Sequence, residues 1–179
     1  KYNLKFKIPN IGQYKLVNKK TSKKKYKNLF INQPSKSFEF LINRYLNHPN
    51  LTYKIYEISY NKKIKCLVVL RIINIKKNSL IKIVDFQGQK KNIIYISGLI
   101  KYLLKVYQPE FIDIVSLGLS KKLLKKIGFK NRKEYKKLIL PDYVNPLVLR
   151  NINLKCGVIP KYNNKMIVMR DDGDRDSPN

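Results

Sequence analysis

The stretch from Leu80 to Leu140, LIKIVDFQGQKKNIIYISGLIKYLLKVYQPEFIDIVSLGLSKKLLKKIGFKNRKEYKKLIL, decides the fold. Over residues 80–86 it is rich in β-branched and aromatic side chains, which predicts a strand. From about residue 92 to residue 107 apolar residues recur at helical spacing instead, and Gln-Pro then ends the helix. The change of period after one buried strand is the first sign of a β-to-α crossover.

The second half of the stretch repeats this order. Residues 111–116 predict a short buried strand, and Ser120 is a natural N-cap for a second helix that ends at Gly128. A further strand is predicted over 135–140, before Pro141. Strands that alternate with helices indicate a βαβ unit with parallel pairing. We therefore expect the functional site of the chain in this stretch, and we do not expect the large positive charge to determine its function.

The preceding residues predict an amphipathic helix and an antiparallel meander. Apolar side chains at helical spacing over 38–46 follow Ser35 or Ser37, either of which can cap the helix. Strands are predicted over 53–60 and 64–75, with short polar turns between them and before the strand at 80–86. The predicted fold class is α/β (α+β): a mixed, mostly antiparallel central sheet flanked by helices.

The two ends of the chain have a different character. Residues 1–34 are a weakly patterned basic lead-in, in which 19–27 is an exposed loop or helix face or, alternatively, a phosphate-contacting patch. A final strand is predicted over 166–169, within a main domain of residues 35–170, and residues 171–179 form an acidic tail. Because the chain begins with Lys1, we expect it to be the C-terminal part of a longer protein.

Composition limits the class of protein. With 179 residues, 44% of them apolar, the chain is long enough for one buried core, and no apolar run reaches the ~18 residues that span a bilayer. The two cysteines and the single histidine, His48, form no disulfide framework or zinc spacing. The net charge of +28 suits a lysine-rich RNA- or ribosome-associated protein. Lysine supplies nearly all of it, however, and joint enrichment of Lys, Ile, Asn and Tyr is typical of AT-rich codon usage.

Short motifs resemble one known family. The run Ser120-Lys-Lys-Leu-Leu-Lys-Lys-Ile-Gly-Phe129 is similar to the helix exit of GNAT-type N-acetyltransferases, whose element order matches the predicted one. The segments Phe40–Pro49 and Ile83–Gly88 and the closing run of residues 173–179 resemble GNAT-like proteins encoded in bacterial surface-polysaccharide gene clusters. The resemblance covers roughly residues 35–179.

The resemblance implies an enzyme that passes the acetyl group of acetyl-CoA to a sugar-type amine. The two isolated cysteines predict a cytoplasmic location. Pantetheine would lie against the strand that ends at Phe86. The pyrophosphate would lie at the start of the next helix, where free amide groups and the helix dipole favour anions. The implied cofactor-binding residues are Phe86, Gln87, Gly88, Gln89, Lys90, Lys91 and Asn92.

Two departures from the family keep an alternative open. The loop before this helix has one glycine, Gly88, where the family has several, and Leu124 stands where a tyrosine commonly protonates the leaving thiolate. A catalytically silent half of a tandem protein, with a binding or scaffolding role beside a second GNAT-like half or in a homodimer, would show both losses.

Asp85 and Glu57 are the candidate catalytic residues. Asp85 ends the central strand, where partial burial would raise its pKa toward the range of a general base; the alternative is a carboxylate that caps the next loop. Glu57 lies on a neighbouring strand and would deprotonate an amine through water; the alternative is a cross-strand partner for lysine.

The acceptor would be bound elsewhere. Arg44 on the first helix and Asp174 and Asp176 in the tail are the candidate acceptor-binding residues. The alternating aspartates from Asp172 onward also have the spacing of oxygen ligands for calcium, but no glutamate follows them, so no metal is expected. Domain docking and a frayed acidic terminus are the other interpretations of this tail.

Overall fold

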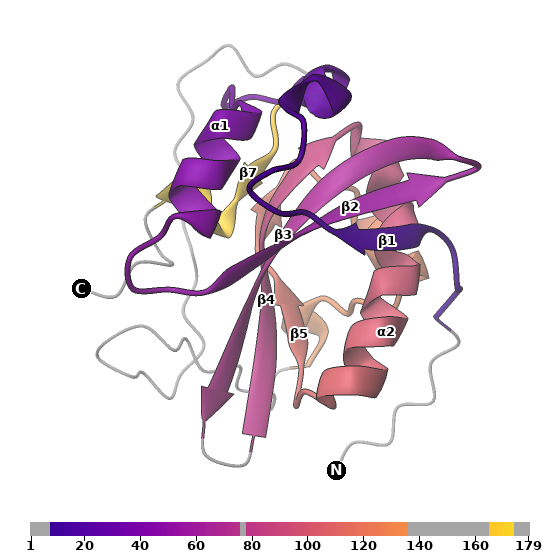
Figure 1. Cartoon of the computed structure of the whole chain (residues 1–179). Coiled ribbons are helices and arrows are strands. Elements are labelled where there is room, and N and C mark those ends of the chain that lie inside the picture. Colours follow the sequence, from indigo (N-terminus) through magenta and orange to yellow (C-terminus); the bar gives the residue numbers. More distant parts are fainter. Residues whose placement is uncertain (1–7, 76–77, 136–164, 174–179) are drawn as a thin grey trace.

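A five-stranded sheet in the order β1-β2-β3-β4-β5 forms the centre of the computed structural model, which describes residues 8–75, 78–135 and 165–173 (Figure 1). Neighbouring strands are antiparallel except β4 and β5, which are parallel. The predicted mixed and mostly antiparallel sheet is therefore confirmed. The strands are β1 (Gln13–Leu16), β2 (Tyr53–Tyr60), β3 (Lys63–Ile75), β4 (Asn78–Gly88) and β5 (Ile112–Ile114).

The hairpin between β2 and β3 turns at two residues with positive φ, Asn61 at 50° and Lys62 at 59°. Left-handed conformations at both central positions match the right-handed twist of the flanking strands, so the two-residue turn joins them directly. Long β-branched runs on both sides supply the strands. The sequence predicted this meander to within two residues at each strand end.

Helices cover both faces of the sheet (Figure 1). On one face η3 (Lys90–Ile96) continues into α2 (Ser97–Tyr107). On the other lie η1 (Lys23–Leu29), α1 (Phe38–Leu41) and the π-helical segment η2 (Ile42–Leu46). Ser37 is the N-cap of α1 and accepts a hydrogen bond from the Phe40 amide, which selects it over Ser35.

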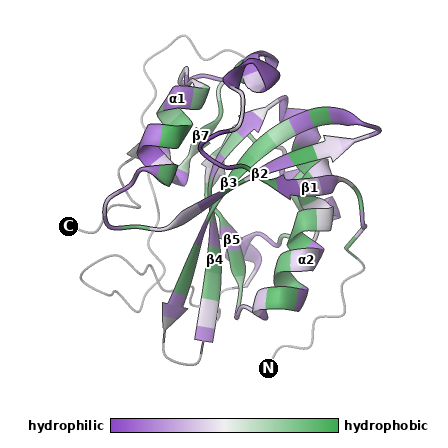
Figure 2. Cartoon of the chain, viewed as in Figure 1, coloured by the Kyte–Doolittle hydropathy of each residue, from purple (hydrophilic) through white to green (hydrophobic). Residues whose placement is uncertain are grey.

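Each face has its own apolar core. The α2 side buries Ile81, Ile83 and Phe86 of β4 with the helical residues Ile96 and Leu103. The opposite side packs Val84 of the same strand against residues of η1, α1 and η2, including Tyr26, Leu41 and Tyr45. Apolar segments line the interior of the sheet and helices, and polar segments lie outside (Figure 2). Both cores meet at β4, which makes this strand the most buried element.

The chain after α2 follows the predicted order of elements in the described residues. Ser120 caps α3 (Lys121–Lys126), and Gly128 ends this turn with φ of +99°. The final strand β7 (Val168–Met169) pairs with β6 (Ser116–Leu117), and not with the main sheet. The short turns η4 (Arg132–Glu134) and η5 (Arg170–Gly173) complete the described elements. Of the strand predicted over 135–140, all but Tyr135 lies outside the described residues.

The weakly patterned first part of the chain contributes more to the fold than its sequence suggested. Strand β1 forms an edge of the sheet against β2, and η1 buries Tyr26 and Leu29 in the core. The basic stretch over 19–27 thus enters a helical turn at Lys23, with its lysines exposed and Tyr26 buried. No helix in the described part of the chain is long and apolar enough to cross a membrane.

Candidate functional site

The end of β4 holds the residues that the sequence singled out. Residues 81–83 of β4 pair with residues 112–114 of β5, and this pairing ends at Ile83. Strand β4 itself continues to Gly88. Beyond Ile83 the two strands therefore part, and the β5-facing edge of Val84–Gly88 lies outside that parallel ladder. The helical turn η3 begins two residues after Gly88, so the strand leads directly into a helix start.

A β-bulge at Val84 decides which way Asp85 points. In the ladder with β3, Val69 pairs with Asp85 and Leu70 with Ile83, so Val84 is the extra residue. A bulge breaks the regular alternation of side chains. As a result both Val84 and Asp85 face the α1 layer: Val84 packs in the core on that side, and Asp85 contacts Tyr45.

Asp85 is fully buried and uses both carboxylate oxygens. Its Oδ2 accepts hydrogen bonds from Lys36 Nζ at 2.8 Å and from Tyr45 Oη at 2.7 Å. Its Oδ1 accepts from the Phe86 amide at 2.7 Å and from Gln87 Nε2 at 2.9 Å. A carboxylate has about four lone-pair positions, and four donors occupy them here. The structure thus places Asp85 in complete burial, where the sequence analysis expected partial burial.

Lys36 completes this cluster and ties the C-terminal segment to it. Its ammonium lies 2.6 Å from Asp172 Oδ1, and the Lys36 side chain is only 5% exposed. Asp172 also accepts from the Met169 amide at 2.7 Å. Burial alone would lower the pKa of Lys36, but the charges of Asp85 and Asp172 outweigh burial and raise that pKa above its ordinary value. Asp172 thus joins the C-terminal segment to this cluster through an ion pair and a main-chain hydrogen bond.

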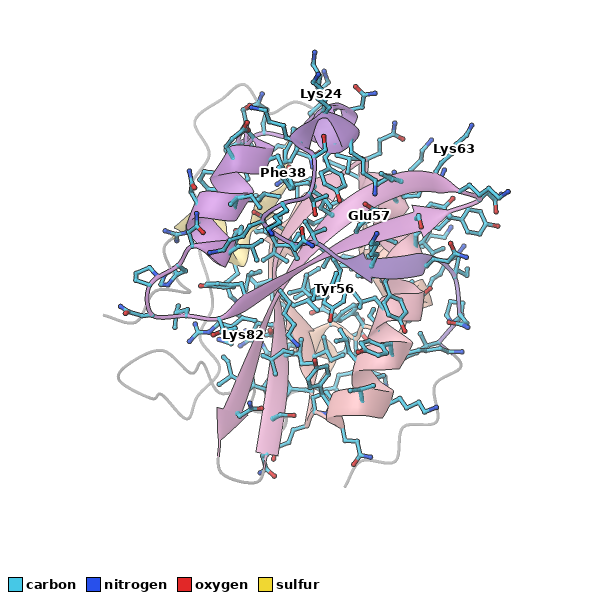
Figure 3. The ribbon with its side chains drawn as sticks, viewed as in Figure 1. Lys24, Phe38, Tyr56, Glu57, Lys63 and Lys82 are labelled. Atoms are coloured by element: carbon cyan, nitrogen blue, oxygen red, sulfur yellow. The ribbon has the colours of Figure 1, made fainter. Side chains whose placement is uncertain are left out.

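Glu57 lies on the same face of the sheet, but in a separate cluster. It accepts a hydrogen bond from Tyr26 Oη at 2.7 Å and pairs with Lys25 Nζ at 2.7 Å. Burial, followed by the hydrogen bond and the charge of Glu57, raises the pKa of Tyr26. Figure 3 shows Glu57 on β2, below the helical turn that carries Lys24. Its lysine partner comes from η1, where the sequence analysis looked for a lysine across the strands.

The two candidate catalytic carboxylates are not brought together. Glu57 pairs with Leu67 of β3, which in turn pairs with Gln87 of β4, so Asp85 lies two residues further along the strand with β3 between them. Each carboxylate has its own lysine and its own tyrosine. The arrangement is that of two separate ion-pair clusters under η1 and α1: the pair of Lys36 with Asp85 is buried, whereas Lys25, which pairs with Glu57, is 41% exposed.

The predicted cofactor-binding residues are contiguous at the helix start, and they differ in exposure. Phe86 and Gln87 are buried, while Gln89 and Lys91 are exposed. A Cβ on Gly88 would lie 2.7 Å from the Lys65 carbonyl oxygen, so only glycine fits this close approach, at a φ of +143°. The single glycine of this loop therefore has a packing role against β3.

Asn92 and Lys90 lie in the first turn of η3. The Asn92 amide donates to the Gln89 carbonyl at 2.8 Å, and its side chain donates to the Lys65 carbonyl at 2.8 Å. These bonds fix the start of the helix against β3. The amides of Lys90 and Lys91 precede the first bond of this turn, which is the position where a helix start meets anions.

Two short segments bridge β4 and β6 beyond the point where β4 and β5 part. Asn32 Nδ2 donates to the Gly88 carbonyl at 3.1 Å. The next residue, Gln33, pairs in parallel with Met166. A Cβ on Gly118, which follows β6, would lie 2.2 Å from the Met166 carbonyl oxygen. The C-terminal segment therefore packs beside the predicted cofactor site, an arrangement that the sequence did not predict.

The acceptor candidates are only partly described. Arg44 is half-buried in η2, on the same layer as Lys36. Asp174 and Asp176 lie outside the described residues. Among the residues that the structure describes, no group of three or more His, Cys, Asp or Glu side chains could hold a metal ion. Cys66 is a buried free thiol whose pKa is raised by burial, and its Sγ donates to the Asn92 carbonyl at 3.9 Å.

The class of protein that these observations define is a mixed α/β protein with a bulged central strand and buried ion pairs. Comparison with known proteins found no matching family model, no similar curated protein and no similar solved structure. The function must therefore be argued from the geometry at the end of β4.

Proposed function

We propose that this chain is a GNAT-type N-acetyltransferase-like domain that binds acetyl-CoA at the end of β4. One observation carries the proposal: the parallel pairing of β4 and β5 stops at Ile83, while β4 continues to Gly88 and leads into a helix. Ligands of α/β sheets bind beyond the carboxyl ends of strands, where neighbouring strands part.

Three local features support binding of this donor. Apart from the Gly88 carbonyl and the Phe86 amide, which are bonded to Asn32 and Asp85, the main-chain edge of Val84–Gly88 that faces away from β3 can bond the amides of a pantetheine chain. The bulge at Val84 redirects this edge, and bulges are frequent next to active sites. The first amides of η3, with Lys90 and Lys91 beside them, can hold phosphate groups. The activity proposed for such a domain is acetyl transfer to a sugar-type amine, and the cytoplasm, where acetyl-CoA is made, is its proposed location.

A second candidate has an observation of its own. All lone-pair positions of Asp85, the candidate base at the end of β4, are taken. Glu57 lies in a separate cluster, where Lys25 and Tyr26 both contact its Oε2. A general base must have a free lone pair within hydrogen-bond distance of the proton that it accepts. This favours the catalytically silent alternative, a GNAT-like half that binds its ligand without transferring the acetyl group.

A thermal-shift measurement with acetyl-CoA tests the binding shared by both candidates. A ligand that binds only the folded chain, at 100 times its Kd, adds about 2.7 kcal/mol, which for a chain of this length raises Tm by about 5–10 °C. Because the chain carries a charge of +28, it attracts every polyanion to some extent, whatever the structure of that polyanion. ATP at the same concentration and salt is therefore the control, and we expect acetyl-CoA to raise Tm clearly more than ATP does.

Matched variants locate the binding. The double variant Lys90→Glu, Lys91→Glu should abolish the difference in Tm shift between acetyl-CoA and ATP. The control is Lys101→Glu, Lys105→Glu on the exposed side of α2, which makes the same charge change and should leave that difference intact. An equal response to both nucleotides overturns the proposal; binding of RNA that falls steeply with salt would then favour a nucleic-acid partner. Release of free thiol in the presence of glucosamine separates the enzyme from the silent domain.

A further inference from the structure

Strand β1 forms an edge of the sheet, and its hydrogen-bond register is fixed by one bond at its end. The Val17 amide donates to the Ile55 carbonyl at 2.8 Å, and every pair in the ladder of β1 with β2 follows the same register. In an antiparallel pair, residues alternate between hydrogen-bonded and non-hydrogen-bonded positions. Gln13 and Lys15 therefore bond to β2, while the amides and carbonyls of Tyr14 and Leu16 point away from it.

The side chains at this edge are exposed and apolar. Tyr14 is 39% exposed, Leu16 is 54% exposed, and Tyr14 packs on Tyr102 of α2 with ring centroids 4.8 Å apart. One turn further along the helix is Val106, which is 53% exposed and lies on the same side as Tyr102. An apolar strip thus runs from β1 onto α2, beside an edge with main-chain groups available for pairing.

The charges around the edge are positive. Lys15 projects from β1 on the other face, and Lys19 and Lys20 follow the strand. The acidic residue paired with Lys15 in the ladder is Glu57, which is already held by Lys25. A lysine in an edge strand disfavours pairing with a like-charged strand. A second copy paired about Lys15 would set the two lysines opposite each other, which is destabilising, and both chains carry +28.

We propose that the β1 edge is a docking site for an extended acidic segment of a partner protein, which adds as a sixth strand. The partner has an acidic residue opposite Lys15, and apolar residues opposite Tyr14 and Leu16 that exchange main-chain hydrogen bonds with them. Strand addition of this kind takes its affinity from the main chain and its specificity from alternate side chains. The site is independent of acetyl-CoA and of the helix start at Lys90.

The probe is the peptide Thr-Val-Glu-Val-Thr-amide with fluorescein on its N-terminal amine, titrated by fluorescence anisotropy into the full chain at constant salt. Hydrogen exchange followed by NMR locates the binding. In the free chain the amides of Tyr14 and Leu16 should exchange faster than those of Lys15 and Val17, and saturating peptide should slow their exchange at least about tenfold. The same peptide N-methylated on both valines keeps its charge and loses the donors, so it should bind at least about tenfold more weakly.

Two variants of the chain complete the test. Leu16→Pro removes an amide that does not bond to β2, so it should weaken peptide binding and leave Tm nearly unchanged. Lys15→Glu should reverse the preference, so that the peptide with Lys in place of Glu binds more tightly than the original. Equal binding of the N-methylated peptide, no binding of either peptide, or protection away from β1 overturns the proposal. A dimer in sedimentation that Leu16→Pro dissociates also overturns it, because a second copy would then occupy the edge.

Discussion

The Lys36 ammonium lies 2.8 Å from Asp85 Oδ2, in a cluster where the lysine side chain is 5% exposed and the aspartate is fully buried. Lys36 precedes α1, and Asp85 lies near the end of β4. The pair therefore links the helical layer to the strand in which both cores meet. The second ion pair of Lys36, with Asp172, brings the C-terminal segment to the same point.

Removing the lysine should destabilise the fold strongly. Lys36→Met leaves Asp85 and Asp172 buried without their cation, and breaking a buried pair in this way costs about 3–5 kcal/mol. Urea unfolding followed by circular dichroism measures the loss. Lys23→Met, which breaks the solvent-exposed pair of Lys23 with Glu39, is the matched control and should leave the midpoint unchanged.

The two residues should also be energetically coupled. In a double-mutant cycle with Asp85→Asn, the double variant should lose less than the sum of the single losses, by about 0.5–3 kcal/mol. A strictly additive cycle would show that the short distance between Lys36 and Asp85 contributes nothing to stability.

Tyr45→Phe tests the second donor to the same oxygen. The Tyr45 hydroxyl is buried and lies 2.7 Å from Asp85 Oδ2, and hydrogen bonds to charged groups contribute about 1.5–3 kcal/mol. We expect a loss of that size in urea unfolding, with no change in the m-value because the ring still fills its place. Tyr14→Phe at the exposed sheet edge is the control, and an equal effect from both changes would contradict a special role for the buried hydroxyl.

Gly88→Ala should destabilise the end of β4. The added methyl group would meet the Lys65 carbonyl oxygen at 2.7 Å and the Cys66 Cβ at 2.9 Å, in a backbone conformation with φ of +143°. Strain of this kind costs about 1–3 kcal/mol. At Gly128 the atoms within reach belong to the flexible side chain of Ile8, so Gly128→Ala should cost less. Comparable losses in thermal unfolding at both positions would show that positive φ alone, and not the close approach, decides the cost.

The sequence predicted those elements that local apolar periodicity and capping residues determine. The strands over 53–60 and 64–75, the capped helix after Ser37 and the helix exit at Gly128 all have periodic apolar residues or local capping chemistry, and each was found within a few residues. Strand β1 gave no such signal, because all four of its side chains are exposed and the alternation that marks a buried face is missing. An edge strand of this kind owes its position to β2 and not to its own sequence.

The candidate site was predictable only in part. Asp85 was singled out because it ends an apolar strand, but its partner Lys36 lies 49 residues earlier in a polar stretch that resembles a loop. Complete burial of Asp85 follows from a bulge at Val84 and from a C-terminal segment that returns to α1, and both are tertiary features. Lys82, also buried on β4, was not singled out from the sequence.

The folded chain should lose stability at high pH, through three buried groups. The pKa of Tyr56 is raised to about 12, first by burial and then by neighbouring tyrosines, and the pKa values of Tyr26 and Lys36 are raised as well. A group whose pKa is higher in the folded state keeps its proton better there, so its contribution is complete below the unfolded value and is lost as pH rises through the folded value. For tyrosine this loss begins near pH 10.0.

The urea midpoint should therefore be constant from about pH 7 to pH 9 and fall from about pH 10 upward. Tyr56→Phe removes one of the three groups and should make the fall between pH 10 and pH 12 shallower, whereas Tyr60→Phe, at a half-exposed ring, should not. A midpoint that rises over this range, or a slope that Tyr56→Phe leaves unchanged, would mean that the fold does not raise the pKa of this ring. That outcome would contradict its burial against Tyr14 and the apolar core on the α2 face.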